Sequence, residues 1–174
     1  SAHADYEDGV NAAFAGDYET AFREFSIAAE AGLDLAQYNL GILYFTGQGV
    51  DQDLEQAFRW TEAAAQQGHI NAQANLGSLY FEGSGVSQDI AQGVAWFSRA
   101  GRAGHANAAF ALANLYLDGD MLERDLVQAH AWANQAVRNE HEEAAQFLAR
   151  LEPRLDGAQL GEARRLFARW QIEF

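Results

Sequence analysis

Apolar side chains recur along the chain at steps of three and four residues, the spacing that places them on one face of an α-helix. The segment AQYNLGILYF at 36–45 shows this spacing, and AQANLGSLYF and AAFALANLYL repeat it at 72–81 and 108–117. A short glycine-bearing loop and a second helical stretch follow each segment. The pattern therefore predicts helices in pairs, about ten in all, with no β-sheet.

A period of 36 residues underlies these pairs. Its clearest markers are leucines, tyrosines and tryptophans in one register: Leu40, Leu76, Leu112 and Leu148, then Tyr44, Tyr80 and Tyr116, then Trp60, Trp96 and Trp132. One helix pair cannot bury both of its apolar faces, so successive pairs must stack. The chain is therefore predicted to be an all-α solenoid whose three periodic tryptophans occupy equivalent buried positions.

Glycine and aspartate mark the expected helix ends. Left-handed stops of the first helices are predicted at Gly47, Gly83 and Gly119. The second helices should begin with capping boxes, because a glutamine follows three residues after Asp53, Asp89 and Asp125. Close approach of the two helices of a pair is expected at the small residues Gly41, Gly77 and Ala113.

The pattern AQYNLGILYFTGQGVDQDLEQAFRWTEAAAQQG resembles the Sel-one-like repeat, a relative of the tetratricopeptide repeat. The resemblance implies a right-handed superhelical solenoid of stacked helix pairs over 1–174, as one domain, with repeats at 34–70, 71–106 and 107–142. It also implies a tetratricopeptide-like first repeat at 5–33 and a partial repeat at 143–155. The third repeat departs from the pattern, because its loop, DGDMLERD, lacks the second glycine.

Residues 156–174 leave the repeat register. Asp156 can cap a last helix in which Leu160, Ala163, Phe167 and Trp170 share one face. This helix is expected to cap the solenoid, which needs a terminal element with one polar face. The alternative is that its apolar stripe docks a partner or a second copy of the chain.

Charge narrows the range of partners. The chain has 174 residues and a formal net charge of −14, and all 11 of its basic residues are arginine. So acidic a surface repels phosphate backbones, and nucleic acid is not an expected partner.

No apolar run reaches the roughly 18 residues of a transmembrane segment. Ala2-His3-Ala4 matches the end of a secretory signal, which favours a periplasmic or secreted location over the alternative, the cytoplasm.

Motifs for catalysis or cofactor binding are missing from the sequence. There is no GxxxxGK[ST] phosphate loop, no GxSxG or HExxH motif, and no cysteine. Glu140-His141-Glu142-Glu143 lacks the spacing of metal ligands and is expected to be a solvated helix junction. The chain is therefore predicted to be non-enzymatic, with no cofactor and no bound metal.

Surface shape remains as the basis of function. In the tetratricopeptide arrangement that the resemblance implies, the first helices line the concave side. The candidate binding residues at its inward positions are Tyr6, Tyr38, Ile42, Phe45, Asn71, Ser78, Phe81, Glu82, Asn107, Phe110, Asn114 and Asp118. Aromatic rings offer large contact area and asparagines can bind a peptide backbone, although some of the rings can instead pack between repeats.

We therefore expect an adaptor that binds a protein or peptide, and Glu82 and Asp118 favour a basic partner. Two alternatives remain. One is an exported cell-envelope or polysaccharide-associated protein with weak enzymatic or ligand-binding activity, and the other is a toxin-neutralising protein.

Overall fold

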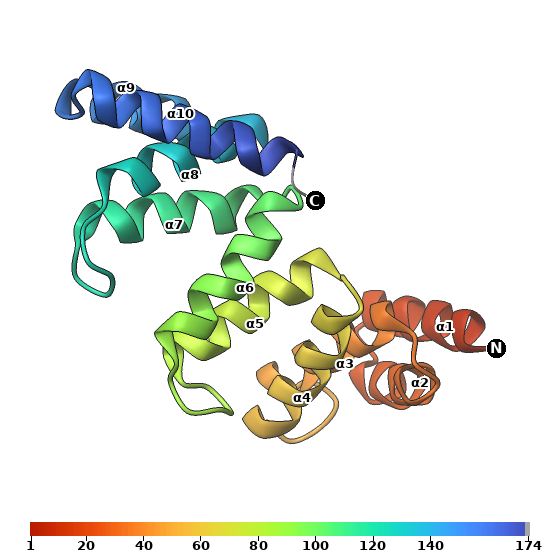
Figure 1. Ribbon diagram of the computed structural model, residues 1–174. Coiled ribbons are helices and arrows are strands. Elements are labelled where there is room, and N and C mark those ends of the chain that lie inside the picture. Colours follow the sequence, from red (N-terminus) through yellow and green to blue (C-terminus); the bar gives the residue numbers. More distant parts are fainter. Residues whose placement is uncertain (173–174) are drawn as a thin grey trace. The chain divides into compact units, whose positions relative to one another are not determined.

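The computed structural model describes residues 1–172, and every regular element among them is a helix, as predicted (Figure 1). The elements in chain order are α1 (Ala2–Phe14), α2 (Tyr18–Glu30), α3 (Asp34–Thr46), α4 (Leu54–Gln66), α5 (Ile70–Glu82), α6 (Ile90–Arg102), α7 (Ala106–Asp118), α8 (Leu126–Arg138), α9 (Ala144–Leu151), the 3₁₀ turn η1 (Glu152–Arg154) and α10 (Gly157–Ile172). None of these helices is long and apolar enough to cross a membrane.

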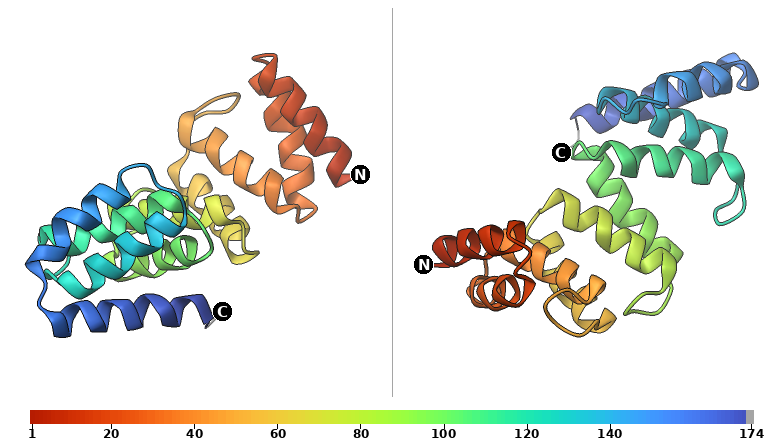
Figure 2. Two further views of the ribbon diagram at one scale, coloured as in Figure 1. Left: turned by 90° about the horizontal axis from the view of Figure 1, so that it is seen from above. Right: turned by 180° about the vertical axis from the view of Figure 1, so that it is seen from behind.

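The helices belong to two compact units, one over Ser1–Gly93 and the other from Val94 onward. In the first unit α1 pairs with α2 and α3 with α4, while in the second α7 pairs with α8 (Figure 2). Helix α5 then packs on α4, and both α9 and α10 pack on α8. One continuous domain over 1–174 and a right-handed superhelix stay predictions.

The loop within each repeat is closed by a hydrogen bond between its two ends. The backbone N–H of Asp53 donates to the carbonyl of Tyr44 at 3.0 Å, and the pairs Asp89–Tyr80 and Asp125–Tyr116 have the same bond and distance. A side chain adds a second closure, donated to the next carbonyl along the first helix. The donors are Gln52 and Gln88, each at 2.8 Å, and Arg124 at 3.0 Å.

These closures correct the predicted capping boxes. The aspartate side chains do cap, because Asp53 accepts from the Gln56 backbone N–H at 3.1 Å. The reciprocal half of the box is wrong, since the aspartate N–H bonds to a tyrosine carbonyl and not to the glutamine side chain. A complete box occurs instead at α10, where Asp156 and Gln159 each accept from the other's backbone N–H, at 2.8 and 2.9 Å.

The second glycine of each GxGV loop touches the preceding repeat. Gly49 and Gly85 have φ of 72° and 73°, and a Cβ there would overlap the carbonyls of Tyr18 and Leu54, respectively. Each carbonyl lies at the start of the second helix one repeat earlier. The third loop has the exposed Met121 at this place, yet its helices α7 and α8 form as expected.

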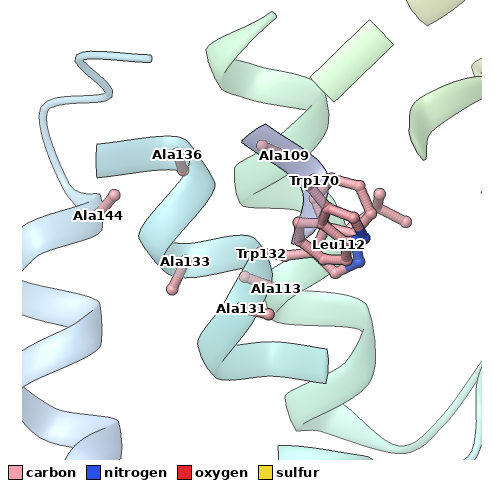
Figure 3. Packing of buried hydrophobic residues seen from close by; sticks show 9 residues of the cluster. All are labelled: Ala109, Leu112, Ala113, Ala131, Trp132, Ala133, Ala136, Ala144 and Trp170. Atoms are coloured by element: carbon pink, nitrogen blue, oxygen red, sulfur yellow. The ribbon is translucent and has the colours of Figure 1, made fainter. Parts of the chain in front are cut away.

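Alanine, leucine and tryptophan fill the core of the second unit (Figure 3). Trp132 from α8 is only 3% exposed, and its ring centroid lies 4.0 Å from that of Trp170 on α10. Trp96 is 9% exposed, whereas Trp60 is half-buried at the margin of the α2–α3 cluster. The expected equivalence of the three tryptophans is therefore wrong for Trp60, which is only half-buried, whereas Trp170 packs on Trp132.

The apolar stripe of α10 packs against its own chain. Ala163 and Trp170 are buried, and Leu160 and Phe167 are half-buried against the clusters around α8. The arrangement is the one that a capping helix requires. Because the chain's own helices cover the apolar stripe of α10, docking of a second copy through these side chains has no support.

The contact at Gly85 generates the first prediction. Alanine at position 85 would have to adopt a left-handed conformation, which costs about 1–2 kcal/mol. Its Cβ would also clash with the Leu54 carbonyl. Gly68→Ala is the matched control, because Gly68 also has a positive φ but a Cβ there meets nothing within 4 Å. We expect Gly85→Ala to lose about 1–3 kcal/mol more in denaturant unfolding. Equal losses in the two variants would show that the loop contact does not matter.

The second prediction compares two tryptophans. Trp132→Ala should lower the free energy of unfolding by about 3–5 kcal/mol, the usual range for a buried aromatic. Trp60→Ala should cost clearly less, because that side chain keeps part of its surface in water. Urea titrations of both variants measure the difference, and similar losses would contradict the burial that distinguishes them.

Candidate functional site

A cavity of about 180 Å³ opens in the first unit between α3, α4 and α5. Four of the predicted residues line it together, namely Ile42, Phe45, Ser78 and Glu82. Phe45 is 41% exposed and Glu82 is also exposed, so these two side chains form the rim. The sequence analysis missed the other lining residues, Gly41, Ala57, Thr61, Asn75 and Leu79.

The back of this cavity exists because α3 and α4 approach closely at a glycine. A Cβ on Gly41 would lie 2.7 Å from the Thr61 hydroxyl oxygen and 3.3 Å from the Ala57 carbonyl. The close approach predicted for this position is confirmed. Thr61 is 4% exposed, so its side chain closes the cavity from behind.

The first unit is strongly acidic. Residues 1–93 contain 14 aspartates and glutamates against two arginines, a net charge of −12. Glu82 is the one charged residue among those that line the cavity, and the Ser84 hydroxyl lies 3.4 Å from its carboxylate. This electrostatic environment favours a cationic group at the rim.

A second cavity, of about 460 Å³, lies within the second unit. One face of α7 supplies Phe110, Asn114 and Leu117, the first two of which are predicted binding residues. The opposite wall comes from α9, its N-cap and η1, a segment expected to be a partial repeat but given no binding residue: Glu143, Gln146, Phe147, Arg150, Leu151 and Arg154. Their spacing of three and four residues was the signal that could have identified this face.

Histidines hold two of the predicted aromatic rings. Phe110 stacks on His141 with centroids 4.0 Å apart and meets Phe147 edge-on at 5.5 Å. Two repeats earlier, in the first unit, Tyr38 stacks on His69 with centroids 4.4 Å apart. The expectation of a merely solvated junction at 140–143 is therefore wrong for His141, which packs on Phe110 and accepts a hydrogen bond from the Glu143 backbone N–H at 3.1 Å.

Several predicted residues lie outside both cavities. Phe81 is 8% exposed and rests on Gly93, where a Cβ would lie 2.8 Å from the ring, so its predicted role as an accessible anchor is wrong. Tyr6 packs in the first core, 5.8 Å from the Phe25 ring. The remaining three are exposed near helix ends and line neither cavity: Asn71, Asn107 and Asp118.

His69 and His105 cap the N-termini of α5 and α7. Their Nδ1 atoms accept from the backbone N–H groups of Ala72 at 3.1 Å and Ala108 at 3.0 Å. Burial lowers the pKa of both imidazoles. Each ring is therefore held in the neutral form that can accept this hydrogen bond.

One group of carboxylates gathers away from the cavities. Oxygens of Asp5, Asp8 and Glu24 lie within 4.8 Å of one another. Exposed acidic groups often cluster on so acidic a surface, and no second feature of the described residues around them points to a cation.

Comparison with known proteins identifies the repeat. Consecutive Sel1 repeats match residues 34–69, 70–105 and 106–141, each beginning within one residue of its predicted start. A protective antigen with an SLR fold from uropathogenic Escherichia coli is 36% identical, covers 88% of this chain and has a TM-score of 0.80. A Sel1 repeat protein from Oxalobacter formigenes is 30% identical, covers 77% of this chain and has a TM-score of 0.71. The predicted family resemblance is confirmed.

Both relatives are longer than this chain, which spans 34% of the first and 55% of the second. An immunity protein from Pseudomonas aeruginosa is 21% identical to this chain, with a TM-score of 0.43. The match covers 99% of this chain and 83% of the immunity protein. No curated protein matches the sequence.

The two histidine caps generate a prediction for pH. Unfolded histidine takes up a proton near pH 6.5, whereas the folded caps do so only at lower pH, so stability should fall as the pH drops below about 6.5. Asparagine caps helices well and does not titrate. Replacement of His69 and His105 by asparagine should therefore flatten this dependence in denaturant titrations at several pH values. The exposed His3→Asn is the control, and an unchanged slope in the double variant would contradict the assignment.

Proposed function

Since the chain belongs to the Sel1 repeat family, we propose that it is a non-enzymatic adaptor that binds a peptide segment of a protein partner at the exposed faces of its first helices. Sel1 repeat proteins generally serve as interaction scaffolds without enzymatic activity. The repeats thus supply a frame, and the side chains at the first-helix faces supply the specificity.

The observation that carries this proposal is the cavity of the first unit. It brings together Ile42, Phe45, Ser78 and Glu82 from two successive first helices. Its volume of about 180 Å³ is smaller than the roughly 300–1,000 Å³ of a small-molecule site. A space of this size, open at the rim, suits a single side chain of an extended or helical peptide.

The cavity lining favours a basic side chain. Ile42 and Leu79 offer apolar contact for the stem of a lysine or arginine, and Glu82 offers a carboxylate for its head. The net charge of −12 over 1–93 would also attract a cationic partner from a distance. Binding of this kind weakens as ionic strength rises.

A displayed peptide library tests the proposal. Panning against the intact protein should enrich sequences with lysine or arginine beside an apolar residue. For the enriched peptides, Phe45→Ala should weaken binding by about 2 kcal/mol, or roughly 30-fold, because truncation removes an exposed aromatic anchor. Glu82→Gln should weaken binding of basic peptides and leave neutral ones unaffected.

Matched controls come from the same unit. Ile27→Ala removes an apolar side chain that is 48% exposed on α2, and Glu55→Gln removes an exposed carboxylate on α4. Both should bind as the unaltered protein does. If these variants lose affinity while Phe45→Ala and Glu82→Gln keep it, the second-helix face carries the function and the proposal is wrong.

A further inference from the structure

The cavity of the second unit has two arginines at its edge without an acidic partner. Arg150 and Arg154 are exposed and line the cavity. Among the residues that the structure describes, neither guanidinium has a carboxylate within 4.0 Å. Both exposed guanidinium groups are therefore available to an acidic ligand.

The helical spacing separates these arginines from the one acidic residue of the cavity. Glu143 precedes Arg150 by seven residues, which corresponds to a rise of about 10 Å along a helix. Gln146 and Phe147 lie between them on the same face. The cavity therefore has a cationic end at Arg150 and Arg154 and an acidic end at Glu143.

The wall between these ends is apolar. Phe110 and Leu117 face it from α7, and Phe147 and Leu151 from α9. The stack with His141 and the edge contact with Phe147 hold the Phe110 ring in place. A ligand here would find a rigid aromatic surface next to two guanidinium groups.

We propose that this cavity binds an acidic peptide segment, in which an aspartate or glutamate stands beside an apolar side chain. Guanidinium groups pair with carboxylates through two parallel hydrogen bonds, a geometry that favours a side-chain carboxylate at Arg150 and Arg154. The apolar neighbour packs on Phe110 and Phe147. The volume of about 460 Å³ accommodates both groups, which the smaller cavity of the first unit does not.

The second unit repels an acidic partner much less than the first unit does. Residues from 94 onward include nine arginines and 11 acidic residues, a net charge of −2, against −12 for 1–93. An acidic peptide meets little repulsion from the second unit and strong repulsion from the first. The contrast in ligand charge comes from the lining residues, which are Glu82 in the first cavity and Arg150 and Arg154 in the second.

This inference rests on the proposed function only in taking a peptide as the occupant. The cavity, the residues and the charge of the ligand all differ from those of the first unit. Substitutions at Arg150 and Arg154 leave Phe45 and Glu82 untouched, so each proposal can fail while the other stands.

The test uses an array of blocked peptides with a central glutamate flanked by varied apolar residues, and a matched array with glutamine in its place. The intact protein should bind members of the glutamate array better than their glutamine counterparts. Arg150→Gln and Arg154→Gln should each weaken this binding about tenfold or more in calorimetric titrations. Glu143→Gln should strengthen it, because that change removes the competing negative charge.

Arg138→Gln and Arg164→Gln are the controls, since both arginines are exposed in the same unit and line neither cavity. Equal binding of the two arrays overturns the proposal, and so does binding that Arg138→Gln reduces as much as Arg150→Gln. Anionic lipid vesicles form a further arm. If they bind in a way that depends on Arg150 and Arg154 while no glutamate peptide does, the ligand is a membrane surface and the proposal is wrong.

Discussion

The hydrogen bond from the aspartate N–H to the tyrosine carbonyl determines how each repeat is built. It joins the start of the second helix to the end of the first, as between Asp53 and Tyr44. The same aspartate also caps the second helix, so one residue sets both where that helix begins and how it leaves the loop. Cavities between neighbouring repeats, such as the one between α3 and α5, depend on that fixed geometry.

The loop closure forms even where the loop sequence departs from the repeat pattern. The third loop lacks the second glycine, yet Asp125 still bonds to Tyr116 and Arg124 takes the place of Gln52 and Gln88 as the side-chain donor. Glutamine and arginine can both donate to the equivalent carbonyl in their own repeat, because each has a side-chain N–H group long enough to reach it. The scaffold therefore needs a donor there, and glutamine is only one way of supplying it.

The two cavities differ at positions where the repeats differ in sequence. The first unit combines an acidic surface with a small cavity whose rim is Phe45 and Glu82. The second combines a larger cavity with Arg150 and Arg154 on a helix that lies beyond the last matched repeat. One scaffold thus carries two cavities of different size and charge.

The sequence by itself determined the repeat, the helix pairs, the glycine stops and the aspartate caps, because all of these depend on residues close together in the chain. It also identified Ile42, Phe45, Ser78, Glu82, Phe110 and Asn114 as residues of the first-helix faces. Only the tertiary structure decided which of the predicted residues remain accessible. Phe81 and Phe45 occupy the same repeat position, but Gly93 leaves room for Phe81 to be buried while Phe45 stays at a rim. Burial is set by neighbours distant in sequence, and so the periodic pattern, which treats equivalent positions alike, does not contain it.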